Sequence, residues 1–348
     1  MGTEMEMEKR VCVTGAGGFV ASWIVKLLLS NGYIVHGTVR DPGGEKYAHL
    51  NKLERAAYNL KLFKADLLDY GSLVSAIAGC TGVIHVACPV PTSTISNPEA
   101  RSAKNKWLCI PSFLIRTVEM LEPAVKGTLI VLRACSEAKV KRVVYISSAA
   151  AVVKNPKWPE DWVKHETCWS DKEYCRATEN WYFLAKTEAE SIAFEYGKQN
   201  GLDVVAVNPS FVFGPVMQPV LNFSTLLLLK FVKGVYIQIE PGDVDGVPNM
   251  LWGIVDVRDV ADAVLLAYKK PESEGRYICV AYNITIKDLA EKLKSLYPDQ
   301  TYLENFGEDD REYCVTSEKL QKLGWTYRQL EETLVDSIKS YKKAGLLD

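Results

Sequence analysis

The chain has 348 residues and a formal net charge of −2 at pH 7, with lysine and arginine spread along its length. This length is sufficient for one large α/β unit or for two domains, each with a buried core. Because the charged residues form no long basic run, the composition does not predict binding to nucleic acid or to an anionic membrane.

Residues 1–8 are acidic and lack an apolar core, so they do not resemble a signal peptide. No segment approaches the roughly 20 apolar residues that a membrane span needs. We therefore expect a cytoplasmic protein in which residues 1–8 form a flexible acidic tail. The nine cysteines follow no metal-ligand spacing, so we expect reduced thiols and no metal site. Cys168 and Cys175 could meet across a turn, but we expect two thiols there as well.

The first structural unit is a strand at residues 9–14, a glycine turn, and an apolar helix at 22–29 that Asn31-Gly32 closes. Glycines let the backbone approach a pyrophosphate, and a helix N-terminus favours its negative charge. This order of elements therefore predicts a dinucleotide-binding fold. The turn residues that we expect to contact the dinucleotide are Gly15, Gly17, Gly18, Phe19 and Val20.

The second strand, at residues 33–39, ends at Arg40. In such folds an arginine at this point accommodates the 2′-phosphate of NADP, whereas an acid hydrogen-bonds the ribose of NAD. Arg40 and Lys46 together predict NADP. Two readings remain beside this one: Asp41 serves a ribose, or the two cations are merely solvated.

Four further strands are expected at residues 60–65, 82–87, 141–146 and 202–208, with a helix at 119–139 between two of them. Alternation of strands and helices predicts an α/β fold with a doubly wound parallel sheet. Asp66 and Leu67 follow the third strand and are expected near the adenine. Ala87 and Cys88 follow the fourth and are expected along the path of the cofactor. His85 lies inside an apolar strand, which favours a packed histidine over a catalytic one.

A helix is expected from Asn180 to the stop signal at Asn200-Gly201. Tyr182 and Lys186 are four residues apart and therefore project from one face of it. A neighbouring ammonium lowers the pKa of a phenol, which makes this tyrosine a tunable acid. Ser148 follows the fifth strand, at the sheet edge where ligands collect. We predict Ser148, Tyr182 and Lys186 as the catalytic residues. The competing interpretation is an ordinary amphipathic helix and a serine that only caps the next turn.

Beyond the sixth strand the pattern changes. Residues 217–250 mix apolar runs with glycine and proline turns, as expected of a segment that covers a substrate. We expect residues 9–208 to form the dinucleotide-binding domain and 209–348 to form mainly a smaller, discontinuous substrate lobe. Within that lobe, about residues 252–280 are expected to return to the first domain.

With these motifs, the chain resembles an extended short-chain dehydrogenase/reductase of the plant cinnamoyl-CoA reductase and dihydroflavonol reductase group. The similarity includes the glycine turn, the run Cys-Trp-Ser-Asp at 168–171, Tyr182 with Lys186, and the run Gly-Arg-Tyr-Ile-Cys at 275–279. The resemblance implies that Ser148 and Tyr182 bind the substrate carbonyl, that Tyr182 delivers the proton, and that Lys186 holds the nicotinamide ribose. It also implies cofactor contacts at Pro209, Val212 and Ser224.

The resemblance further implies an NADPH-dependent reductase of phenylpropanoid and lignin metabolism that acts on hydroxycinnamoyl-CoA thioesters, as a monomer or weak dimer. Lignin-pathway reductases carry a His, a Lys and an Arg in the substrate pocket, and the matching positions here are Leu227, Lys230 and Arg258. Loss of the histidine leaves free aldehydes or ketones as alternative substrates. A non-catalytic NADP(H)-binding regulatory protein also stays open and, at lowest rank, so does a sugar-nucleotide epimerase.

The resemblance is interrupted at residues 100–117. We expect an inserted loop there that the fold does not need; a splice or gene-model artefact is the alternative. Pro111 argues against one uninterrupted helix through it.

Overall fold

The computed structural model describes residues 9–88, 120–159, 162–234, 247–300, 302, 304, 306–310 and 314–347. The expected tail at 1–8 and the expected loop at 100–117 lie outside the described residues. Among the described residues, no helix is long and apolar enough to cross a membrane.

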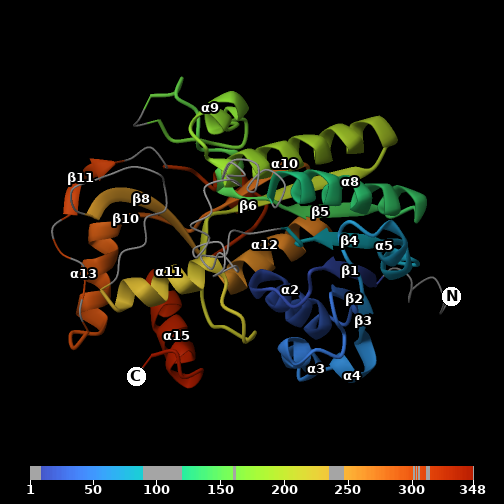
Figure 1. Cartoon of the computed structure of the whole chain (residues 1–348), viewed down its shortest axis with the longest axis horizontal. Helices are drawn as coiled ribbons and strands as arrows, with labels where there is room; N and C mark the ends of the chain where they lie inside the picture. The colour runs from blue at the N-terminus through green and yellow to red at the C-terminus, as the bar shows by residue number, and fades with distance from the viewer. Residues whose placement is uncertain are drawn as a thin grey trace, which may run out of the picture.

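The main sheet has seven parallel strands in the order β3-β2-β1-β4-β5-β6-β9 (Figure 1). Their bounds are β1 (Arg10–Thr14), β2 (Ile34–Val39), β3 (Leu60–Lys64), β4 (Gly82–His85), β5 (Arg142–Ile146), β6 (Asp203–Pro209) and β9 (Gly275–Cys279). The predicted α/β class and the doubly wound parallel sheet are confirmed.

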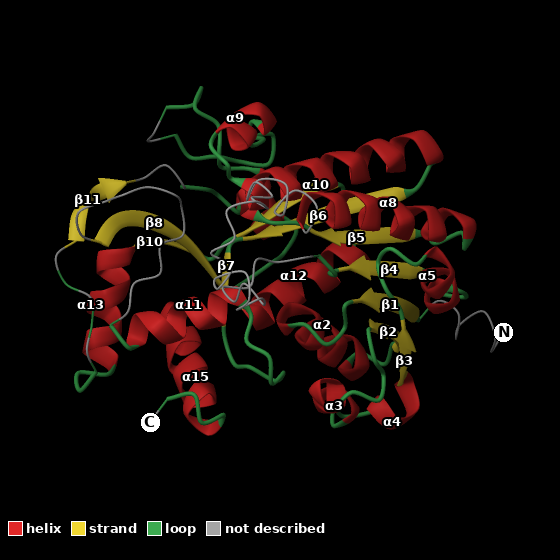
Figure 2. Ribbon diagram, viewed as in Figure 1, coloured by secondary structure: helices red, strands yellow, loops and turns green. Residues whose placement is uncertain are grey.

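Helices cover both faces of this sheet (Figure 2). α2 (Phe19–Ser30) and α12 (Val257–Lys269) pack together on one face, and α5 (Tyr70–Ile77), α8 (Glu122–Glu137) and α10 (Trp181–Asn200) pack on the other. Because both faces are covered, central strands such as β4 are buried along their whole length. α10 ends as predicted at Gly201, whose φ of 64° is a conformation that glycine adopts without strain.

A second lobe holds a small mixed sheet and three longer helices. The strands are β7 (Phe211–Phe213), β8 (Val247–Asp256), β10 (Tyr282–Thr285) and β11 (Phe306–Asp310), and the helices are α11 (Phe223–Val232), α13 (Ile286–Leu296) and α15 (Leu330–Lys343). Shorter segments are α3 (Ala48–Asn51), α4 (Ala56–Asn59), α9 (Lys172–Ala177), α14 (Glu318–Lys322) and the 3₁₀ turns η1 (Glu45–Tyr47) and η3 (Ala149–Ala151).

Residues 252–280, which we expect to return to the first domain, contribute elements to both sheets. α12 and β9 do lie against or within the main sheet, whereas β8 pairs with β10 and β7 in the small sheet. The reason is that β8 has two apolar faces: Trp252 and Ile254 pack into the core of the second lobe, and Val255 packs into the core shared with α2 and α12. Its apolar pattern therefore does not reveal which sheet it joins.

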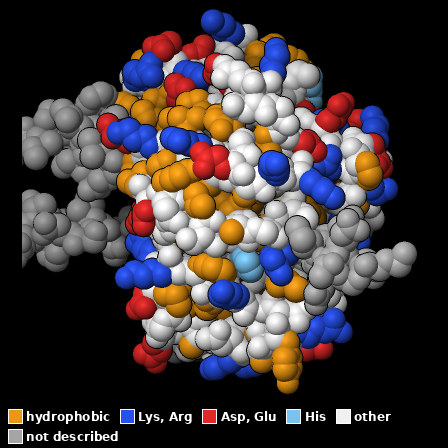
Figure 3. Space-filling model, turned by 90° about the vertical axis from the view of Figure 1, so that its right-hand side faces the viewer, with side chains coloured by type: hydrophobic (Ala, Val, Ile, Leu, Met, Phe, Trp, Pro, Cys, Tyr) orange, Lys and Arg blue, Asp and Glu red, His pale blue; other side chains and the backbone are white. Residues whose placement is uncertain are grey.

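Cys168 and Cys175 are both buried and form no disulfide bond. On the face shown in Figure 3, cationic and anionic side chains are interspersed, and neither sign dominates the described residues there.

A buried chain of hydrogen bonds joins β1, β4 and α8 near the carboxyl ends of the strands. The Thr14 hydroxyl lies 2.8 Å from Nδ1 of His85, and the Thr128 hydroxyl lies 3.4 Å from Nε2. Thr14 Oγ1 already accepts from the backbone N–H groups of Val86 and Ala87, so its own proton points to His85 Nδ1. The imidazole therefore carries its proton on Nε2 and donates it to Thr128. His85 is a packed histidine, as predicted.

This buried imidazole makes stability depend on pH. Burial, together with the nearby charge of Lys186, lowers the pKa of His85 to about 3. The unfolded chain, with a histidine pKa of about 6.5, binds a proton below that pH while the folded protein does not, so folding weakens as the pH falls from 6.5. Between pH 7 and pH 5 we expect His85 to account for a loss of about 2 kcal/mol in the free energy of unfolding.

Urea unfolding of the wild-type protein and of His85→Gln at pH 7 and pH 5 measures this contribution. It is the difference between the two proteins in how steeply the free energy of unfolding depends on pH. Thr128→Val is the control, because it removes one bond to the ring and keeps the titrating group. Equal pH slopes for the wild-type protein and His85→Gln would contradict the assignment.

Candidate active site

The predicted site residues follow strands that end at the same edge of the sheet. Thr14 is paired with His85, His85 with Tyr145, and Ile146 with Val207. In a parallel sheet this register brings together the segments that follow each strand. The turn at Gly15, the pair Ala87 and Cys88, Ser148 and Pro209 therefore lie along one edge.

The glycine turn has the backbone geometry that a pyrophosphate requires. Gly15 has a φ of 65°, and a Cβ added there would lie 3.0 Å from the Cβ of Ala87. Gly18 precedes α2 without any side-chain cap, so no side chain of the described residues accepts from the first amides of this helix. Free amides at a helix N-terminus favour an anion. Phe19 and Val20 belong to this first turn, and the residues present fit a dinucleotide.

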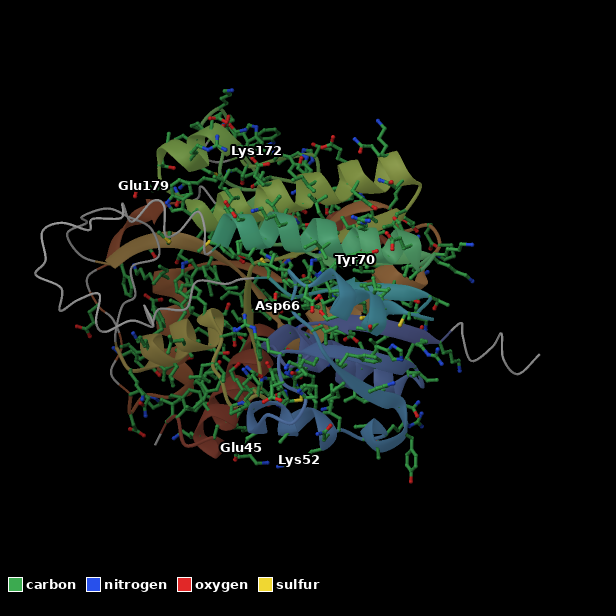
Figure 4. All side chains as sticks on the ribbon, turned by 45° about the vertical axis from the view of Figure 1, so that its right-hand side comes forward. Glu45, Lys52, Asp66, Tyr70, Lys172 and Glu179 are labelled. Carbon is green, nitrogen blue, oxygen red and sulfur yellow. The ribbon has the colours of Figure 1, made fainter. Side chains whose placement is uncertain are left out.

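Tyr47 is a neighbour of the glycine turn that the sequence pattern did not identify. The ring of Tyr47 lies directly on Gly17, because a Cβ added at Gly17 would be 2.2 Å from Cδ1 of that ring. Lys46 Nζ lies 4.9 Å from the centroid of the same ring. Glu45 and Lys52, labelled in Figure 4, mark the surface segment that carries both residues. The signal is absent from the local sequence, since the contact joins residues 30 positions apart.

The other adenosine-side residues lie on loops at this edge. Arg40 and Lys46 are exposed. Asp41 accepts at 3.2 Å from the N–H of Gly43, which commits one of its oxygens to the turn. Asp66, labelled in Figure 4, is exposed after β3 and accepts at 2.9 Å from the N–H of Leu68. Leu67 packs against Gly127 of α8.

Ser148 is 8% exposed and both caps a turn and keeps a proton to donate. Its Oγ accepts at 3.1 Å from the N–H of Ala150, at the start of η3. A hydroxyl that accepts one hydrogen bond still has its own proton for another partner. The capping role and the predicted catalytic role are therefore compatible.

Lys186, on α10, lies close to the segment that carries Ser148. It is 4% exposed, and its Nζ donates at 3.3 Å to the carbonyl of Ile146, two residues before Ser148. Burial opposes the charged form of Lys186, but the neighbouring side chains of Cys88, Tyr182 and Tyr145 outweigh burial and raise its pKa. Lys186 therefore carries a positive charge at neutral pH, one helical turn after Tyr182.

Tyr182 lies one turn before Lys186 and is partly exposed, whereas Lys186 is buried. α10 packs against η3, which follows Ser148 directly. The structure thus brings Ser148, Tyr182 and Lys186 into one region of the edge.

The remaining predicted cofactor positions lie at the end of the main sheet and on the first elements of the second lobe. Pro209 is the last residue of β6, Val212 is 6% exposed in β7, and Ser224 is partly exposed on the first turn of α11.

Two of the three residues predicted to bind substrate have structural partners: Leu227 lies in the core of the second lobe, and Arg258 joins α12 to that lobe. Leu227 is 2% exposed. Arg258 donates to both carboxylate oxygens of Asp256 at 3.0 and 2.8 Å and to Asp336 at 2.7 Å. Burial opposes the charge of Arg258, but these two carboxylates raise its pKa. Lys230, on α11, is partly exposed.

Comparison with known proteins identifies the family of the chain. A model described as the NAD dependent epimerase/dehydratase family matches residues 109–285, and one for GDP-mannose 4,6 dehydratase matches residues 12–106. The chain is 40% identical to cinnamoyl-CoA reductase 1 of Petunia hybrida, covering 97% of this chain and 93% of that protein. It is also 40% identical to tetraketide alpha-pyrone reductase 1 of Arabidopsis thaliana, with 97% of each covered.

Among solved structures, vestitone reductase from alfalfa is 31% identical with a TM-score of 0.77, covering 97% of this chain and 99% of that one. Yeast methylglyoxal/isovaleraldehyde reductase complexed with NADPH is 26% identical with a TM-score of 0.78, covering 97% and 100%. The chain therefore belongs to the NAD-dependent epimerase/dehydratase family of extended short-chain dehydrogenases/reductases, as a cinnamoyl-CoA reductase-like, NAD(P)-dependent oxidoreductase.

Proposed function

We propose that this protein reduces the carbonyl of hydroxycinnamoyl-CoA thioesters with NADPH, in phenylpropanoid metabolism. The observation that carries the proposal is the convergence of Ser148, Tyr182 and a buried, charged Lys186 beside a glycine turn that fits a dinucleotide. The proposed site comprises these three residues and the predicted cofactor positions from Gly15 to Ser224.

NADP is the proposed cofactor because Arg40 and Lys46 lie exposed at the end of β2 and in the turn after it. Arg40 would hold the 2′-phosphate through charge-assisted hydrogen bonds, and Lys46 would add a second cation. A relative of the same fold, the yeast methylglyoxal/isovaleraldehyde reductase, was solved with NADPH.

Bound NADPH would supply the hydride that the carbonyl carbon receives. The chain's own residues stabilise the charge that develops on the carbonyl oxygen. Ser148 keeps its hydroxyl proton available because its Oγ is held by the N–H of Ala150. Tyr182 donates a second hydrogen bond and then transfers its proton to the forming alkoxide, one helical turn from the ammonium of Lys186. Two fixed donors aimed at a forming alkoxide are an effective way to lower the barrier.

With a thioester, the reduced adduct collapses to an aldehyde and releases CoA; with an aldehyde or ketone, the reaction stops at the alcohol. Relatives at equal identity support each reading, a cinnamoyl-CoA reductase and a tetraketide alpha-pyrone reductase. Leu227, buried in the lobe core, supplies no polar partner in place of the histidine of lignin-pathway reductases, so reduction of free aldehydes or ketones stays as the second candidate. A non-catalytic regulatory role is the weakest reading, because all three catalytic side chains are present.

Oxidation of NADPH followed at 340 nm, with feruloyl-CoA and coniferaldehyde compared side by side, separates the two substrate classes. We expect faster turnover of feruloyl-CoA, with release of free CoA detected by a thiol reagent. Turnover of coniferaldehyde alone would move the assignment to the free-carbonyl class, and turnover of neither would contradict both.

Tyr182→Phe should lower kcat by about 100-fold or more, because general acids contribute at least that factor. The dissociation constant of NADPH, measured by fluorescence titration, should change little because the ring is retained. Phe183→Tyr, at the adjacent position of α10, is the control and should keep turnover. A Tyr182→Phe variant with wild-type kcat would contradict the mechanism.

The contact between Gly17 and Tyr47 should matter for cofactor binding. Gly17→Ala places a Cβ inside the Tyr47 ring and displaces it together with Lys46, at a cost of about 1–3 kcal/mol that should appear as weaker NADPH binding. In a Tyr47→Ala background the same change should have no effect. Gly43→Ala is the control, since its nearest neighbour would be 3.8 Å away. Equal losses in the two backgrounds, measured by calorimetry, would refute the steric pair.

A further inference from the structure

Two motifs of this sequence take no part in the proposed chemistry, and the structure joins them through one side chain. They are the run at 168–171 and the run at 275–279, which contains Arg276 on β9. Arg276 is 5% exposed, and its guanidinium lies 3.7 Å from the centroid of the Trp169 ring. A buried cation must be satisfied by partners, and those of Arg276 include the turn after Ser148 and the helix that carries Tyr182 and Lys186.

Each nitrogen of Arg276 has an acceptor. Nε donates to Glu190 Oε1 at 2.5 Å. Nη1 donates to the carbonyls of Cys168 at 2.5 Å and Glu166 at 3.1 Å, and Nη2 donates to the carbonyl of Ala151 at 3.1 Å. Arg276 therefore binds the carbonyl of Ala151, the last residue of η3, and Ser148 is the N-cap of that turn.

Glu190 completes the connection from α10. It is fully buried, and it lies four residues after Lys186 and eight after Tyr182, on the same helix face. Its Oε2 accepts from the hydroxyl of Ser147 and, at 2.8 Å, from Nδ2 of Asn208. Asn208 Nδ2 also donates at 3.1 Å to the carbonyl of Ser148.

The turn that carries the Ser148 hydroxyl is thus held at both ends. Asn208 holds the Ser148 carbonyl, Arg276 holds the Ala151 carbonyl, and both are bound to one carboxylate on the helix that presents Tyr182 and Lys186. We propose that Glu190 and Arg276 are positioning residues that fix the Ser148 hydroxyl relative to Tyr182 and Lys186. The inference rests on the proposed function, because it assigns the pair to the same catalytic residues.

Arg276→Lys tests the proposal, because it keeps the buried positive charge and loses the planar fork that spans Glu190 and three carbonyls. We expect kcat to fall by about tenfold to 100-fold, since small misplacement of a catalytic group has effects of this size, with the dissociation constant of NADPH unchanged. In a Ser148→Ala background, Arg276→Lys should lower kcat no further. An equal fold-loss in both backgrounds would overturn the proposal.

Arg142→Lys is the matched control. Arg142 is also a largely buried arginine of the main sheet. It lies 2.7 Å from the carboxylate of the exposed Asp203 and also donates to backbone carbonyls, those of Ala267 and Lys270. It lies at the opposite, amino-terminal edge of the strands, at the start of β5. The control should lower the melting temperature and leave kcat unchanged below that temperature. A loss of kcat as large as that of Arg276→Lys would show a general effect of stability and overturn the proposal.

Hydrogen exchange provides a readout that needs no turnover. The amides of Ala150, Ala151 and Val152 are bonded within the turn to Ser148 and Ala149. Arg276→Lys should speed their exchange, and Arg142→Lys should not. Unchanged exchange in Arg276→Lys would overturn the proposal even if kcat falls. If the wild-type protein reduces no carbonyl with NADPH, the proposed function fails, while this exchange comparison still decides whether the pair holds the turn.

Discussion

Helix α10 brings a lysine and a glutamate into the interior, and the rest of the site depends on the partners that these two side chains find. Lys186 and Glu190 lie one turn apart, and both are almost completely buried. A buried charge is tolerated only with close partners, so the helix can rotate or slide very little without leaving one of them unpaired. The partners are Ile146 at the end of β5, Asn208 near the end of β6, and Arg276 at the start of β9. Tyr182 lies one turn earlier on the same face. Its position is therefore fixed by the partners of Lys186 and Glu190, which hold the helix in place.

The part of the edge that carries Gly15 and Ala87 is held by hydrogen bonds between neutral side chains. The neutral imidazole of His85 links Thr14 to Thr128, and Thr14 in turn holds the amides of Val86 and Ala87. This places Ala87 against Gly15, where any side chain at the glycine would be in contact with it. A neutral network suits this position because a second buried cation beside Lys186 would be repelled. The dinucleotide side and the catalytic side are therefore held by different physical means.

The structure around the second lobe shows why Leu227, Lys230 and Arg258 are a poor guide to the choice of substrate. Arg258 is committed to Asp256 and Asp336, and Leu227 is packed among apolar side chains of the lobe core. These residues stabilise the lobe in this chain, whatever the matching residues do in relatives. Selection between a thioester and a free carbonyl must therefore depend largely on other side chains of the lobe.

Local patterns in the sequence determined the strands of the main sheet, the glycine turn, and α10 with its tyrosine, lysine and terminal glycine, because each depends on residues a few positions apart. Only the tertiary structure decided that β8 joins the small sheet, that Tyr47 lies on Gly17, and that Arg276 meets Glu190 across 86 positions. Apolar periodicity reports that a face is buried, but not which core buries it. A charged residue inside an apolar strand likewise gives no sign of its partner, because the partner is chosen by the folded chain and not by sequence spacing.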